Sequence, residues 1–114
     1  MHSQLKIKYI GKGEYMIVFS ADKVFYLYTY SQKLRNASLT FKKEMEMGID
    51  NVCINELGTC FIILENREVI SIVVGSDYSI NRLTKVGKKS AKIIANHKFV
   101  ALLNTDKTVS VLNL

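Results

Sequence analysis

The stretch CFIILENREVISIV, residues 60–73, contains the pattern on which the fold depends. Five consecutive apolar residues precede the polar turn Glu65-Asn66-Arg67, and a second apolar run follows it. Unalternating runs of this length, rich in β-branched and aromatic side chains, are typical of strands that are buried on both faces. The stretch therefore predicts a hairpin of two buried strands.

The same hairpin pattern occurs three times in the chain. Its turn residues Asp22, Asn66 and Asp106 are 44 and 40 residues apart. The other two copies have apolar runs at 15–19 and 99–103, turns at 20–23 and 104–107, and second strands at 24–28 and 109–112. Shorter strands are expected before the hairpins at 5–10, 50–55 and 91–95, and half-polar strands after the first two at 37–43 and 78–85. Each unit thus has up to four strands.

This gradient from a fully apolar to a half-polar strand is expected of a propeller blade, whose middle strands lie between neighbouring blades. A period of roughly 40 to 45 residues with four strands is the period of propeller blades. We predict an all-β fold with one domain over 1–114, a partial β-propeller. Its blades span 5–43, 49–85 and 90–114, and the last blade lacks its outer strand.

The end of the chain, DKTVSVLNL at 106–114, resembles the close of a WD repeat, where an acidic turn leads into T-V-x-V-W-D-L. Leu112-Asn113 stands where the Trp-Asp pair would be. The chain has no tryptophan, and no Gly-His pair precedes any unit. The internal Asp-His-Ser-Trp hydrogen-bond network of that family therefore cannot form in its usual way. The resemblance implies a diverged WD-like propeller with a role in protein binding.

The segment 34–47 allows a second interpretation. A helix there would change the fold class to α+β, whereas the alternation at 38–41 favours a strand. The residues at helical spacing, amid good helix formers, are Leu34, Ala37, Phe41 and Met45.

Three blades are fewer than the four to eight with which propellers typically close. We therefore expect apolar sheet faces at both ends, and large apolar patches usually mark interfaces. The last strand would also offer an unpaired edge to a partner, with Val109, Val111, Leu112 and Leu114 on it. The predicted function is a non-catalytic scaffold in an intracellular complex, completed by another protein or by self-association, for instance as a six-blade ring of two chains.

Charge suggests an alternative partner, because the formal net charge is +6. The stretch 78–98 contains six basic residues and no acid: Arg82, Lys85, Lys88, Lys89, Lys92 and Lys98. These residues would contact phosphates in an RNA-associated accessory protein of a ribonucleoprotein. The other interpretation is a lysine-coated surface that guards the outer edge of the sheet. Few aromatic residues interleave with the lysines, which argues against sequence-specific reading of single strands.

Catalytic chemistry is not predicted. His2 lies at the terminus, and His97 lies in a turn without a carboxylate or cysteine nearby in sequence. The cysteines and histidines match no zinc pattern, and the residues 87–90 fail as a phosphate loop. No cofactor, metal or small-molecule substrate is expected. The apolar runs are far shorter than a membrane helix or a secretory signal, so we expect no membrane association and an intracellular location.

Cys53 and Cys60 flank a turn at 55–58. A four-residue connection would place the two cysteines opposite each other, whereas a three-residue turn with a bulge at Gly58 would shift them out of register. We expect two reduced thiols in the core, which suits an intracellular protein.

Overall fold

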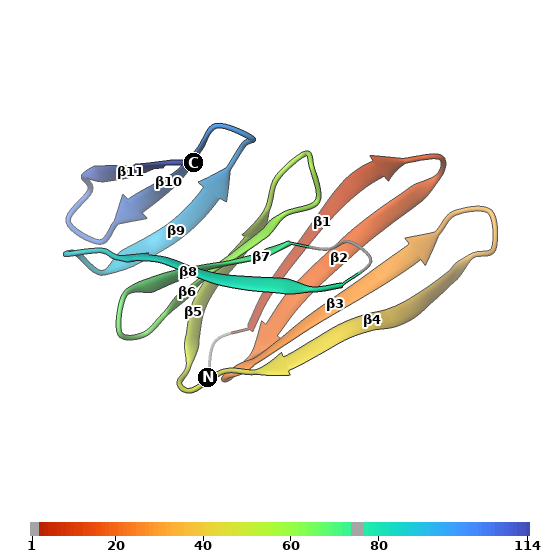
Figure 1. Cartoon of the computed structure of the whole chain (residues 1–114), viewed down its shortest axis with the longest axis horizontal. Coiled ribbons are helices and arrows are strands. Elements are labelled where there is room, and N and C mark those ends of the chain that lie inside the picture. Colours follow the sequence, from red (N-terminus) through yellow and green to blue (C-terminus); the bar gives the residue numbers. More distant parts are fainter. Residues whose placement is uncertain (1–2, 74–76) are drawn as a thin grey trace.

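The computed structural model describes residues 3–73 and 77–114, which form three antiparallel β-sheets (Figure 1). Sheet 1 consists of β1 (Ser3–Gly11), β2 (Glu14–Ala21), β3 (Val24–Ser31) and β4 (Asn36–Glu44). Sheet 2 consists of β5 (Ile49–Ile54), β6 (Cys60–Leu64), β7 (Glu68–Val73) and β8 (Ser79–Lys85). Sheet 3 consists of β9 (Ser90–Ala95), β10 (Phe99–Asn104) and β11 (Val109–Asn113). The prediction of an all-β chain with units of four, four and three strands is confirmed.

The segment 34–47 contains a strand, so the helical alternative is wrong. β4 pairs with β3 along its length, and Phe41 lies opposite Leu27. A bulge after Leu27 shifts the register, so that Tyr28 lies opposite Leu39. Because β3 supplies a long apolar partner strand, cross-strand pairing outweighs the helical spacing of the apolar residues.

Sheet 2 lies between sheets 1 and 3 and shares a hydrophobic core with each (Figure 1). The alternation of β6 divides its side chains between the two cores. Towards sheet 1 point Cys60, Ile62 and Leu64, which pack with Met16, Val18, Phe25 and Leu27. Towards sheet 3 point Phe61 and Ile63, which pack with Ile93, Val100 and Leu102. The prediction of a strand buried on both faces is confirmed for 60–64.

The corresponding strands of sheets 1 and 3 are covered on one face only. In β2, Met16 and Val18 are buried, whereas Ile17 and Phe19 are partly exposed. In β10, Val100 and Leu102 are fully buried, whereas Leu103 is exposed. The prediction that 15–19 and 99–103 are buried on both faces is therefore wrong for the described chain, because these sheets have a neighbour on one side only.

The turns between strands place the sheets in a repeated arrangement. The Met45 amide at the exit of sheet 1 donates to the Lys23 carbonyl over 2.8 Å. The Val86 amide at the exit of sheet 2 donates to the Arg67 carbonyl over 2.9 Å. Lys23 and Arg67 occupy the same place in their units, directly after the turn residues Asp22 and Asn66. The bonds therefore place the exits of sheets 1 and 2 at the same position in their units.

Candidate interaction surfaces

Sheet 1 presents an uncovered apolar face on the side opposite the core. Residues directly opposite each other in neighbouring strands share a face, so the register identifies three rows across the sheet. The rows combine β1, β2, β3 and β4 as Leu5-Phe19-Tyr26-Lys42, Ile7-Ile17-Tyr28-Leu39 and Tyr9-Tyr15-Tyr30-Ala37. We call this surface the aromatic face and define it by ten residues: Leu5, Ile7, Tyr9, Tyr15, Ile17, Phe19, Tyr26, Tyr28, Tyr30 and Leu39.

Rings contact one another across the aromatic face. Phe19 stacks on Tyr26 with ring centroids 4.5 Å apart, and the Lys42 ammonium lies 5.4 Å from the centroid of the Tyr26 ring. Tyr9 and Tyr15 are 5.0 Å apart by centroid. These contacts fix the side chains at little further entropic cost, which is a property of protein-binding surfaces rich in aromatic residues.

Exposure on the aromatic face is highest along β1, where Leu5 is 70% exposed and Ile7 is 61% exposed. Single exposed apolar residues are ordinary, but contiguous apolar patches are uncommon on soluble monomers and mark binding surfaces. The apolar side chains here are contiguous over four strands.

Sheet 3 has a second uncovered apolar face, again on the side opposite the core. Two rows of paired residues form it, Ile94-Ala101-Val111 and Lys92-Leu103-Val109. We call the apolar residues Ile94, Ala101, Leu103, Val109 and Val111 the aliphatic face. It contains a hollow of about 230 Å³, which the Lys92 side chain borders. Sheets 1 and 3, which carry these two faces, lie at opposite ends of the molecule along its 43 Å axis (Figure 1).

The predicted edge strand is found as β11, which pairs with β10 and is the outermost strand of sheet 3. Val109, Val111 and Leu114 are exposed, by 63%, 54% and 53%. Leu112 differs, because it points to the other side of the sheet and packs against the core shared with sheet 2. Leu112 is therefore a core contact rather than part of the aliphatic face.

The six basic residues predicted for nucleic-acid binding lie on several different elements. Arg82 and Lys85 are on β8, Lys88 and Lys89 are in the connection to β9, Lys92 is on β9, and Lys98 is in the turn before β10. Lys88 pairs with Asp106 over 3.0 Å and donates to Thr108. Arg82 forms ion pairs with Glu46 and Glu68. Nucleic-acid binding by these residues stays a prediction.

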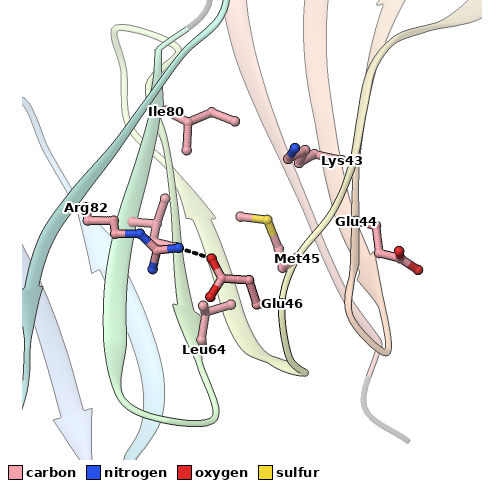
Figure 2. A pocket seen from close by; sticks show the side chains of 8 residues that line it. Lys43, Glu44, Met45, Glu46, Leu64, Ile80 and Arg82 are labelled. Carbon is pink, nitrogen blue, oxygen red and sulfur yellow. Dashed lines mark hydrogen bonds and ion pairs between the residues drawn. The ribbon is translucent and has the colours of Figure 1, made fainter.

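Arg82 and Glu46 border a pocket of about 190 Å³ between the end of β4 and sheet 2 (Figure 2). Figure 2 shows the Glu46 carboxylate and the Arg82 guanidinium meeting above the apolar side chain of Leu64, which also lines the pocket. Ile70 and Ile80 also line it. The pair links the segment after β4 to the outer strand of sheet 2. Sequence reasoning missed it, because Glu46 and Arg82 are far apart in the chain.

The cysteines are free and buried, and Gly58 sets them out of register. Cys60 lies opposite Ile54, and Cys53 lies opposite Phe61, so the thiols point to different faces of sheet 2. Gly58 has φ = 80° within a three-residue turn, as one of the two sequence interpretations required. Burial raises the pKa of both thiols to about 12, which keeps them protonated and unreactive near neutral pH.

In the structure a carboxylate lies beside His97, although none of the residues next to it in sequence carries one. His97 Nδ1 lies 3.3 Å from a Glu56 oxygen, and both side chains are about half exposed. His2 lies outside the described residues. Within 3–73 and 77–114, no three histidine, cysteine or acidic side chains gather in a way that would hold a metal ion.

No protein-family model matches this chain, and a comparison with curated proteins finds no significant match. In the described part of the chain, no helix has the length and apolar character needed to cross a bilayer.

Proposed function

We propose that the chain is a non-catalytic protein-interaction module, a partial WD-like propeller whose first and last blades bind a partner through their open faces. The observation that carries this proposal is the aromatic face of sheet 1. Its apolar side chains are contiguous, ordered by mutual contacts and opposite the core, so they take no part in the packing of one sheet on another.

The propeller arrangement is supported by the way the first strands of the three sheets converge. Residues of β1, β5 and β9 line one shared pocket of about 280 Å³, among them Lys8, Cys53 and Ile93. β5 contacts β1 and β2 on one side and β9 on the other. First strands around a central hollow, with half-polar fourth strands outside, are typical of propeller blades.

Burial of the open faces would supply the binding free energy. Removing apolar surface from water stabilises a complex by roughly 25 cal/mol per Å², before the costs of association are subtracted. The aromatic face offers large rigid side chains, which are the usual hot spots of interfaces. The exposed edge of β11 would add backbone hydrogen bonds to a partner strand.

Capture from a native cell extract tests the proposal. Ile17 lies in the middle row of the aromatic face, so Ile17→Glu places a charge at its centre. Asn81→Glu adds the same charge on exposed β8 and serves as the matched control. We expect the wild type and the control to retain the same bound proteins, and Ile17→Glu to lose them. The proposal is overturned if the wild type binds no protein, its own copies included.

A further inference from the structure

We propose that the aromatic face binds the aliphatic face of a second copy of this chain, so that sheet 3 of one copy packs on sheet 1 of the next. This inference rests on the proposed function and names its partner. It follows from the way the three sheets already pack on one another within one chain.

The sheets have the same relative orientation at the two internal interfaces. β6 of sheet 2 uses Cys60, Ile62 and Leu64 to pack on sheet 1, and β10 of sheet 3 uses Val100 and Leu102 to pack on sheet 2. We call this side of each sheet its front, and the opposite side its back. At both interfaces the front of the later sheet meets the back of the earlier sheet. The open ends are consequently one front, the aromatic face, and one back, the aliphatic face.

The turns confirm that front and back are equivalent in sheets 2 and 3. The Arg67 amide donates to the Leu64 carbonyl over 2.8 Å, and the Lys107 amide donates to the Asn104 carbonyl over 3.0 Å. Arg67 and Lys107 also share a positive φ, 73° and 70°. Counting back from these turns, Ala101 of sheet 3 stands at the position of Phe61 in sheet 2.

At Ala101 the sizes of the side chains are complementary between the open ends. The back of sheet 3 has Ala101 where sheet 2 has Phe61, and the hollow of about 230 Å³ lies beside it. The front of sheet 1 has Tyr26 and Tyr28 where sheet 2 has Ile70 and Ile72. The larger rings on the front of sheet 1 would fill the space beside Ala101, as close packing requires.

An asparagine adds a polar contact of matching geometry. Asn55 donates from Nδ2 to the Asn96 carbonyl over 3.2 Å, which links the inner turns of sheets 2 and 3. Asn96 has the same local role as Asn55, because its Oδ1 accepts from the amides of Lys98 and Phe99. Its Nδ2 has no acceptor among the described residues. Gly11 is the equivalent residue in sheet 1, so the Gly11 carbonyl of a second copy is the expected acceptor.

The number of copies follows from the range of known propellers. Head-to-tail contacts close into a ring if the rotation permits. Two copies give six blades, within the usual range of four to eight, whereas three copies would give nine. Two aromatic faces packed on each other would instead join front to front, a contact that neither internal interface uses.

The test measures the mass of the purified chain by size-exclusion chromatography with light scattering. We expect a dimer of the 13.0 kDa chain. Ile17→Glu blocks the front and Leu103→Glu blocks the back, so each alone should raise the dissociation constant about 100-fold. An equimolar mixture should associate more strongly than either variant alone, because one of its two interfaces then contains no glutamate. Asn81→Glu should remain dimeric, and circular dichroism checks that every variant is folded.

Three results would overturn the inference. The first is a wild-type chain that stays monomeric at about 100 µM, a concentration far above a functional dissociation constant. The second is a Leu103→Glu variant that remains dimeric while Ile17→Glu does not, which indicates two aromatic faces in contact. The third is a mixture that associates no more strongly than either variant alone. If the wild type is monomeric but captures another protein through Ile17, only the inference fails. If it captures nothing, the proposed function fails as well.

Discussion

β2 and β6 have equally apolar sequences and different surroundings. Each contains five consecutive apolar residues, but all five are buried in β6, whereas in β2 only alternate residues are. The apolar content of a strand indicates how many of its faces are suited to burial. Its exposure in the single chain shows how many of those faces the chain itself buries. A strand whose apolar content exceeds its burial therefore identifies a surface that needs a partner.

The largest expected effect comes from removing the same ring in the two strands. Phe61 is 1% exposed, so Phe61→Ala leaves a cavity and should lower the free energy of unfolding by about 3–5 kcal/mol. Phe19→Ala removes a ring from the aromatic face and should cost under about 1.5 kcal/mol in the dissociated chain. Urea denaturation at low protein concentration measures both. Equal losses of unfolding free energy in the two variants would show that β2 is buried on both faces as β6 is.

A smaller difference is expected between two equivalent asparagines. Asn55 is buried, so Asn55→Asp removes the donor to the Asn96 carbonyl and places a carboxylate beside it. The substitution should lower the free energy of unfolding by about 1–3 kcal/mol, because a buried polar group loses its hydrogen-bond partner.

Asn96→Asp is the matched variant, since its Oδ1 contacts are kept and no intrachain donor bond is lost. We expect a change of stability within about 0.5 kcal/mol in the separate chain, together with weaker self-association. Urea titration and light scattering measure the two effects separately. A large loss of stability at position 96 in the dissociated chain would contradict the equivalence.

The two thiols report whether sheet 2 is closed on both sides, because Cys53 faces sheet 3 and Cys60 faces sheet 1. We expect alkylation by iodoacetamide at mildly alkaline pH to be at least about 100-fold slower in the folded chain than in urea. Mass spectrometry of the labelled peptides measures each rate. Rapid labelling of one cysteine would show that its side of sheet 2 opens easily.

The same thiols predict a loss of stability at high pH. Burial raises the pKa of each thiol from 9.0 to about 12 in the folded chain, so the unfolded chain ionises first. The stabilisation is therefore complete below pH 9 and is lost as the pH rises towards 12. A double variant with both cysteines changed to alanine should lose this component of the pH dependence.

The smallest effect is expected at an exposed carboxylate in sheet 3. A hydrogen bond from the Thr108 side chain, helped by Lys88, lowers the pKa of Asp106 from 3.8 to about 2. Its contribution is present above pH 4 and is lost as the pH falls towards 2. Asp106→Asn should reduce the dependence of the melting temperature on pH in that range only. A large change in the melting temperature of Asp106→Asn near neutral pH would contradict this prediction.

The strands were predictable from sequence because their signals are local. The apolar runs, the turn at 65–67 and the positive φ of Gly58 each depend on a few neighbouring residues. The coverage of each face was not predictable, because it depends on which sheets stack. The same reason hides the contact of His97 with Glu56 and of Arg82 with Glu46, which join residues from different units. The aromatic face itself was expected only as an apolar end, and the register between four strands was needed to identify its members.

The division of β6 between two cores has a consequence for how the gene can change. Because side chains alternate along a strand, inserting one residue in β6 would send Ile62 and Leu64 to the wrong side and exchange them with Phe61 and Ile63. One such insertion would damage both cores at once. Insertions and deletions in related sequences should therefore be confined to the hairpin turns, and the five residues of β6 should keep a constant length.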